Sequence, residues 1–228
     1  MSASNQQIVI TVEHASNFIP DTLLQYFKSQ KGILDSHRAY DKFTSIIADN
    51  LSKRLQAPCI IGRNSRLICD LNRSLHSRRL FSEFVKDELT QKDKEKLIFT
   101  YYSPFRKKTR DTIEKIIEEQ KSVLHLSIHS FNPELNINRQ NVELGLLYDP
   151  SREAEKQFAL NFRRFLAQEF RVRLNFPYRG TDDGHTTALR KVFKSDDYLG
   201  IELEFNHGLP DTRIFDMVDK IYSFLSSQ

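Results

Sequence analysis

Short runs of apolar residues alternate along the chain with longer segments in which apolar residues recur every three or four positions. The first run, residues 8–12 (IVITV), is almost wholly apolar and rich in β-branched side chains. Such runs are typical of strands that are buried on both faces of a parallel or mixed sheet. The same reasoning predicts further strands at residues 58–61, 67–71, 123–128, 142–148, 171–175 and 199–205.

Helical periodicity occupies most of the intervals between these strands. In residues 40–55, apolar side chains at Phe43, Ile47 and Leu51 repeat at the spacing of one helix face. Comparable patterns predict helices at 22–29, 104–121, 152–169 and 211–225, and Ser151 is the expected N-cap of the helix at 152–169. Residues 76–100 are highly charged and are expected to form a solvated segment with short helices, and 178–185 a loop. The alternation predicts one α/β domain over residues 1–228, a three-layer α/β/α arrangement with a mixed, mostly parallel central sheet.

Composition narrows the class of protein. The chain has 228 residues, of which 39% are hydrophobic and 28% charged, so it has enough apolar material for a core and is not expected to be disordered. Lys and Arg number 34 against 30 Asp and Glu, and this net charge of +4 is spread along the chain. A nucleic-acid binder would concentrate its positive charge on one face, so no nucleic-acid partner is expected.

The expected location is the cytoplasm. The N-terminal segment has no basic stretch followed by an apolar run, which argues against a secretory signal, and no stretch approaches the roughly 18 apolar residues of a membrane span. Cys59 and Cys69 are interpreted as packing residues in a reducing compartment. Neither GxGxxG nor GxxxxGK[ST] occurs, which disfavours dinucleotide and P-loop sites.

Chemically reactive side chains gather just after or between the predicted strands. In open α/β sheets, functional sites form at the carboxyl ends of strands, so these groups are expected to converge on one edge of the sheet. The groups are Glu13-His14 with Asn17, the segment 63–73 (RNSRLICDLNR), His129-Ser130, and Glu202 with Glu204.

His14 and His129 are candidate metal ligands. Neutral imidazole is the commonest protein ligand of metals, and a catalytic zinc typically has three protein ligands and one open position. A third, carboxylate ligand would therefore have to join the two histidines. The alternative interpretation is that each histidine is partly buried and hydrogen-bonded without a metal, since no HxxH, HExxH or CxxC spacing accompanies them.

The segment 63–73 carries three arginines, Arg63, Arg66 and Arg73, beside Asn72. Arginine binds carboxylates through two parallel hydrogen bonds, so this segment suits a small anionic substrate. The alternative is a structural ion pair between Asp70 and one of these arginines.

Glu202 and Glu204 lie in an otherwise apolar strand and are expected to project from the same face. An acid on a central strand is costly to bury unless it is paired or functional, and Glu202 is therefore a candidate general base near a metal-bound water. The alternative is an edge strand with one wet face.

The short motifs around these groups keep a defined order along nearly the whole chain. They are VEHASN at 12–17 with Ile19-Pro20, Asp41, SRL at 65–67, DLNR at 70–73, HSF at 129–131 with Pro133, Pro177-Tyr178 with Gly180, Asp183-Gly184, and Ile201-Glu202. As a set they resemble the N-formylglutamate amidohydrolase family. That family is similar in fold to zinc carboxypeptidases and to the aspartoacylase group, which implies a zinc carboxypeptidase-like (phosphorylase/hydrolase-like) architecture here.

The resemblance also implies a site and a reaction. One Zn²⁺, or another divalent metal, would activate water to cleave the amide of a small N-acyl amino acid such as N-formylglutamate. No nucleic-acid or membrane partner is implied, and the oligomeric state is left open. The implied roles are metal ligands His14, His129 and Asp41, a general base Glu202, carbonyl polarisation by Arg66 or Arg63, and substrate contacts from Arg63, Asn72, Arg73, Ser130 and Tyr178.

Two positions depart from the family patterns. Asn17 stands where zinc carboxypeptidases have a glutamate ligand, so the carboxylate ligand is expected to be Asp41, in the first long helix, or Glu13. Asp41 is preferred because Glu13, on a strand, would point away from His14. Glu204 stands where members of the N-formylglutamate amidohydrolase family often have an arginine, two residues after the strand glutamate. These changes leave open a non-catalytic protein that binds an acidic metabolite or partner, or an amidase or peptidase for another acyl group.

Overall fold

The computed structural model describes residues 6–30, 32–136 and 141–227, which form a six-stranded sheet in the order β2-β1-β3-β6-β4-β5. All neighbours are parallel except β4 and β6, so the predicted α/β fold with a mixed, mostly parallel sheet is confirmed. The expected domain bounds, 1 and 228, lie outside the described residues. The strands are β1 (Gln6–Val12), β2 (Cys59–Ile61), β3 (Ser122–Phe131), β4 (Leu144–Leu147), β5 (Val172–Leu174) and β6 (Tyr198–Asn206).

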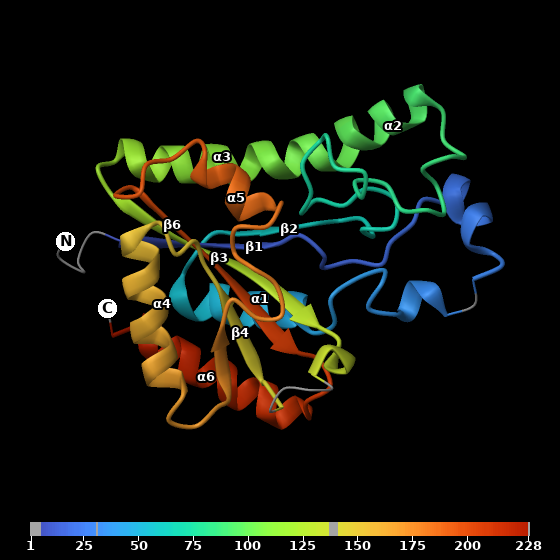
Figure 1. The fold of residues 1–228 in the computed structure, drawn as a ribbon. Coiled ribbons are helices and arrows are strands. Elements are labelled where there is room, and N and C mark those ends of the chain that lie inside the picture. The colour runs from blue at the N-terminus through green and yellow to red at the C-terminus, as the bar shows by residue number, and fades with distance from the viewer. Residues whose placement is uncertain (1–5, 31, 137–140, 228) are drawn as a thin grey trace.

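Helices cover both faces of the sheet (Figure 1). Alternate residues of β1 enter different cores, because Ile10 packs among the residues of α1, α4 and α6, whereas Val9 packs with those of α2 and α3. This two-sided burial explains the almost wholly apolar strand sequences. The helices are α1 (Thr44–Leu55), α2 (Gln91–Leu97), α3 (Ser103–Glu118), α4 (Glu153–Leu166), α5 (His185–Arg190) and α6 (Asp211–Leu225), with a π-helical turn, Ile98–Tyr102, between α2 and α3.

The three central strands bring polar residues into line across the sheet. Thr11 of β1 lies opposite Ser127 of β3, and Ser127 lies opposite Glu202 of β6. Two residues further along, and so on the same face of the sheet, His129 lies opposite Glu204. Because β1, β3 and β6 run parallel, their carboxyl ends meet at one edge of the sheet. Glu202 and Glu204 are both buried on a central strand, so the alternative of a wet edge strand is wrong.

The predicted strand at 67–71 is wrong, since these residues form turns. The run is apolar because the turn is buried against the core around α3. Its main-chain groups form hydrogen bonds with residues outside the run rather than with a neighbouring strand. Asp70 N–H donates to the carbonyl of Leu80, and the Asn64 amide donates to the carbonyl of Cys69.

Three local expectations also need correction. Asp41 precedes α1 rather than lying in it, because Phe43 adopts a left-handed conformation (φ 67°) and the helix begins at Thr44. β3 extends to Phe131, so His129 lies within the strand rather than after it. Ser151 does not cap α4, since its hydroxyl donates to Asp149 and the helix begins at Glu153.

No helix among the described residues has the length and apolar character needed to cross a membrane.

Candidate metal centre

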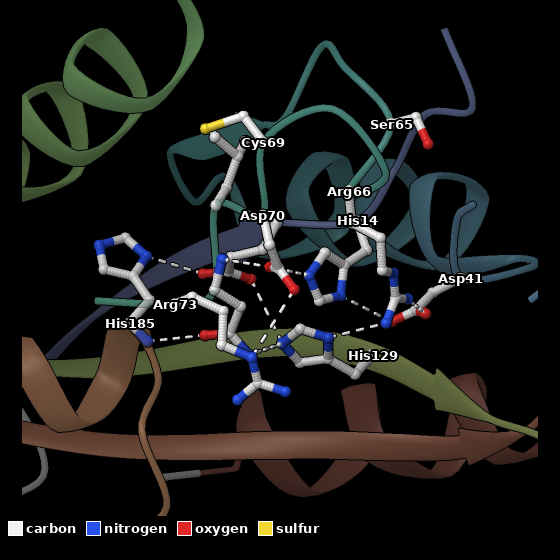
Figure 2. A network of polar contacts seen from close by, with 12 residues as sticks. His14, Asp41, Ser65, Arg66, Cys69, Asp70, Arg73, His129 and His185 are labelled. Atoms are coloured by element: carbon white, nitrogen blue, oxygen red, sulfur yellow. Dashed lines mark hydrogen bonds and ion pairs between the residues drawn. The ribbon is translucent and has the colours of Figure 1, made fainter. Parts of the chain in front are cut away.

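His14, Asp41 and His129 form a buried cluster whose ligand atoms all lie within 4.8 Å of one another. Asp41 Oδ2 lies 3.0 Å from Nδ1 of His129 and 3.4 Å from Nδ1 of His14. His129 lies in β3, whereas His14 and Asp41 lie in the connection between β1 and α1, where the N–H of Asp41 donates to the carbonyl of His14. Figure 2 shows the two imidazoles and the carboxylate turned toward one another.

The outer nitrogens of both histidines are already engaged. His14 Nε2 lies 2.6 Å from Asp70 Oδ1, and His129 Nε2 lies 3.0 Å from the hydroxyl of Ser127 and 3.4 Å from Glu13 Oε2. Metal-binding histidines characteristically use their second nitrogen in this way, which orients the ring. The Nδ1 atom of each histidine is thereby turned toward the centre of the cluster.

The donor set fits a divalent cation. His14 Nδ1 is buried without a hydrogen-bond partner, which is costly for a polar atom unless something binds it. Two imidazole nitrogens and one carboxylate oxygen are the donors of many catalytic zinc sites. Burial and the nearby Arg66 lower the pKa of His14 to about 4, so its imidazole is neutral near pH 7 and has a lone pair available for a metal.

Asp70 is the charged partner of His14 in this arrangement. Burial alone would raise the pKa of its carboxyl, but His14 and Arg66 outweigh burial and hold the pKa below its usual range. Arg73 Nε lies 3.7 Å from the same carboxylate. The ion pair considered from sequence is therefore present, and it is joined to the metal-ligand cluster through His14.

Glu13 lies behind His129, on the side away from the cluster. Its buried carboxylate accepts hydrogen bonds from the hydroxyls of Thr11 (2.9 Å) and Ser127 (2.7 Å) and contacts His185 Nδ1 at 2.7 Å. Of the two carboxylates left open by the sequence, the ligand-atom cluster contains Asp41 and not Glu13. Asn17 is outside it too, because its amide donates to the carbonyl of Leu34 on an exposed segment.

His185 was missed by sequence reasoning. It begins α5 at the end of a predicted loop and forms no local motif of its own. Its position directly after Asp183-Gly184, a pair already included in the family resemblance, was the only signal. Its contact with Glu13 depends on the tertiary fold.

A cavity of about 500 Å³ opens onto the cluster. Its wall includes the predicted site residues with the exception of Arg63, namely His14, Asp41, Arg66, Asn72, Arg73, His129, Ser130, Tyr178 and Glu202, and it also includes Glu204. The structure thus brings together residues from β3, from β6 and from the segments that follow β1, β2 and β5. This is the convergence expected at the carboxyl ends of parallel strands.

Arg63 is not brought to this cavity. It is exposed and lines a separate hollow with Cys59, Tyr101 and Phe105, beside α3. Gly62, the residue after β2, packs tightly against the residue after β1. A Cβ at this position would lie 2.4 Å from the carbonyl oxygen of Glu13. Arg63 then faces α3, whereas Arg66 returns to the metal-ligand cluster.

Arg66, Asn72 and Arg73 form one wall of the cavity. The guanidinium of Arg66 contacts Asp41 Oδ1, the oxygen turned away from the two histidines. Asn72 Oδ1 accepts a 2.6 Å hydrogen bond from the N–H of His185, which fixes the amide. Arg73 donates to the carbonyl of Asp183 at 2.8 Å. These contacts hold the three side chains in the wall of the cavity.

The two strand glutamates differ in their partners. Glu202 Oε1 accepts a short hydrogen bond from the hydroxyl of Thr186. Glu204 Oε2 is buried and has no hydrogen-bond partner. Burial raises the pKa of Glu204 to about 7, with Glu202 adding to the rise and His129 and Arg66 opposing it. Glu204 therefore combines an uncommitted oxygen with a pKa suited to proton transfer near neutral pH.

Two comparisons with known proteins find matches to this chain. The family model of N-formylglutamate amidohydrolase matches residues 6–209. The fold is similar to a gene product of Agrobacterium tumefaciens (24% identity, TM-score 0.81, covering 100% of this chain and 92% of that one). It is also similar to N-formylglutamate amidohydrolase from Ralstonia eutropha (13% identity, TM-score 0.75, covering 97% and 93%). No curated protein matches the chain significantly.

Proposed function

Because the chain belongs to the N-formylglutamate amidohydrolase family, we propose that it is a zinc-dependent hydrolase of a small N-acyl amino acid such as N-formylglutamate. Family membership supports amide hydrolysis as the reaction. One observation carries the proposal, namely that His14, His129 and Asp41 have ligand atoms within 4.8 Å of one another, beside a cavity lined by arginines.

The metal in this proposal is held by Nδ1 of His14, Nδ1 of His129 and a carboxylate oxygen of Asp41. Three protein ligands leave one position open, as in catalytic rather than structural zinc sites. Zinc there would supply Lewis-acid chemistry, lowering the pKa of a water toward about 7 and polarising the amide carbonyl. Asp70 and Glu13 would fix the two imidazoles from behind.

Substrate binding falls to the cavity wall formed by Arg66, Asn72 and Arg73. Arg73 and Asn72 would hold the carboxylate of the N-acyl amino acid, because guanidinium and amide N–H groups are matched to carboxylate oxygens. Arg66, beside Asp41, would lie at the carbonyl and stabilise negative charge that develops on its oxygen. Ser130, whose buried hydroxyl has no hydrogen-bond partner, and Tyr178 would complete the contacts.

The proton-transfer role is better suited to Glu204 than to Glu202, which the sequence favoured. Glu204 lies opposite His129 in the sheet, and its Oε2 has no hydrogen-bond partner. Glu202, in contrast, already accepts a hydrogen bond from the Thr186 hydroxyl. Glu204 would accept a proton from the attacking water and return it to the leaving nitrogen. Burial would raise the pKa of Glu204, and like-charge repulsion from Glu202 would add to the rise.

Release of formate from N-formyl-L-glutamate tests the proposal. The protein is stripped with a chelator, reloaded with one equivalent of Zn²⁺, and assayed beside N-acetyl-L-glutamate and N-formyl-L-alanine. We expect formate release that is lost on chelation and restored by zinc. Undiminished activity in the stripped protein would contradict the metal assignment. A protein that holds one zinc but hydrolyses none of the three substrates would contradict the reaction.

A further inference from the structure

Three further arginines, Arg78, Arg79 and Arg179, line the mouth of the cavity and are exposed. Arg78 and Arg79 come from the segment after Arg73, and Arg179 follows Tyr178. Within the part of the chain that the structure describes, none of the three guanidinium groups has a hydrogen bond or ion pair with a carboxylate. They are cationic donors that face the cavity without an anionic partner.

The acidic residues at the same mouth are engaged with the main chain instead. Asp182 accepts a hydrogen bond from the N–H of Arg179 at 3.1 Å. The carboxylate of Asp183 accepts from the N–H and the hydroxyl of Ser74, at 3.2 and 3.3 Å. These bonds, together with the one from Arg73 to the Asp183 carbonyl, tie the two arginine-bearing segments to each other. The two segments that carry Arg78, Arg79 and Arg179 are thus held together at the mouth of the cavity, which we call the rim.

The cavity is larger than N-formylglutamate requires. Its volume of about 500 Å³ lies in the range of sites for drug-sized ligands, roughly 300–1,000 Å³. N-Formylglutamate has only about a dozen non-hydrogen atoms, and its reacting amide must reach the floor of the cavity near His14 and His129. Bound there, it leaves the outer part of the cavity, where the three arginines lie, unfilled.

We propose that Arg78, Arg79 and Arg179 form an outer anion subsite for a further acidic group of the substrate, beyond those of N-formylglutamate itself. The substrate class is then an N-acyl glutamate extended through its side-chain carboxyl by another acidic unit, as in a γ-linked glutamyl peptide. The amide is cleaved at the floor while the distal carboxylates lie on the rim. This inference rests on the proposed function, because the floor of the cavity sets the direction of the substrate.

Arginine suits this role because its planar fork binds carboxylates through two hydrogen bonds. The rim is exposed, so each contact is weakened by water and salt and contributes modestly. The subsite is therefore expected to act on affinity through the sum of several contacts. Its contribution is expected to decline as ionic strength rises.

The test compares two γ-linked substrates of matched size. N-Formyl-γ-L-glutamyl-L-glutamate carries the extra carboxylates, and N-formyl-γ-L-glutamyl-L-glutaminamide replaces them with neutral amides. We expect the zinc-loaded protein to prefer the acidic substrate in kcat/KM, with most of the difference in KM. In the Arg78→Gln/Arg79→Gln variant the preference should fall by about two- to thirtyfold, and in Arg179→Gln by about 1.4- to fivefold.

Arg63→Gln is the matched control, since Arg63 is also exposed but lines a different hollow. It should keep the wild-type preference, and 0.5 M NaCl should weaken that preference in the wild type. Equal kcat/KM for the two substrates, or a preference that survives both sets of rim variants, would overturn the subsite.

Failure of the proposed function gives a different result. If no formate is released from any substrate, the reaction is contradicted, and the subsite is then judged by calorimetry with γ-L-glutamyl-L-glutamate and its neutral amide. Tighter binding of the acidic dipeptide that disappears in the rim variants supports the subsite. Equal binding of the two dipeptides refutes it.

Discussion

Glu13 Oε1 lies 2.7 Å from Nδ1 of His185, although the two residues are 172 positions apart in the chain. Glu13 Oε2 accepts a 2.7 Å hydrogen bond from Ser127 and lies 3.4 Å from Nε2 of His129. One buried carboxylate therefore connects α5 to β3 directly behind a candidate metal ligand. Burial would raise its pKa, but His185 and His129 hold the pKa of Glu13 well below its usual range. Glu13 is consequently ionised where it can orient His129.

Replacing Glu13 by glutamine should weaken metal binding. The change preserves size but removes the charge behind His129, and loss of such a supporting partner typically costs about 10- to 100-fold in metal affinity. Competition with a chromogenic chelator measures the zinc dissociation constant. Glu134→Gln, at an exposed position, serves as the control. An unchanged dissociation constant in Glu13→Gln would show that the carboxylate does not support the ligand.

His14→Ala and His129→Ala should each abolish stoichiometric zinc. Removing one imidazole leaves only two protein donors at the centre, too few for a stable catalytic zinc site. Elemental analysis of the purified variants gives the metal content directly. His76→Ala removes an exposed histidine and should retain the wild-type content. One equivalent of zinc remaining in either cluster variant would remove that histidine from the ligand set.

Glu204→Gln should lose most turnover while keeping its metal. General acid–base catalysis contributes about 10²- to 10⁴-fold, and glutamine cannot accept the proton. Glu202→Gln should reduce kcat less, because Glu202 accepts a hydrogen bond from Thr186 and acts on Glu204 through its charge. Steady-state kinetics of both zinc-loaded variants decide between them. The reverse order of effects would return the base role to Glu202.

The rate should rise with pH through neutrality. The pKa of Glu204 is raised to about 7, mainly by burial, so its carboxyl is protonated below that pH and cannot act as a base. Ionisation above about 7 produces the active form, and kcat/KM is expected to fall about tenfold for each pH unit below it. The residual activity of Glu204→Gln should lack this acidic limb. A wild-type profile that is flat from pH 5 to 8 is incompatible with the assignment.

Glu155 and Arg190 form a buried pair whose loss should destabilise the fold. Glu155 Oε1 lies 3.0 Å from Arg190 Nε and also accepts the N–H of Gly200 at 3.0 Å, which attaches α4 and α5 to β6. Glu155→Ala leaves Arg190 buried and unpaired, at a cost of about 3–5 kcal/mol. Thermal unfolding should show a Tm lower by roughly 6–20 °C. Glu153→Ala, an exposed position on the same helix, should change Tm little.

The pattern of apolar residues was sufficient to predict the α/β architecture. The apolar runs of β1 and β6 indicated buried strands because both faces of these strands are covered, and the bounds of α6 matched the prediction because its apolar period is regular. The sequence also placed His14 and His129 at one edge of the sheet. That followed because parallel strands separated by helices bring their carboxyl ends together.

Contacts between segments far apart in the chain complete the site. Asp41 joins the histidines because a left-handed residue, Phe43, delays the start of α1. Arg63 lines a hollow beside α3, whereas Arg66 contacts Asp41 in the metal-ligand cluster. Glu202 accepts a hydrogen bond from the Thr186 hydroxyl of α5, whereas Glu204 Oε2 has no such partner. Local patterns report burial and periodicity, whereas the direction of a loop side chain depends on contacts made far away in sequence. The contact between Glu13 and His185 depends on such distant contacts, because the two residues are 172 positions apart and meet only in the folded chain.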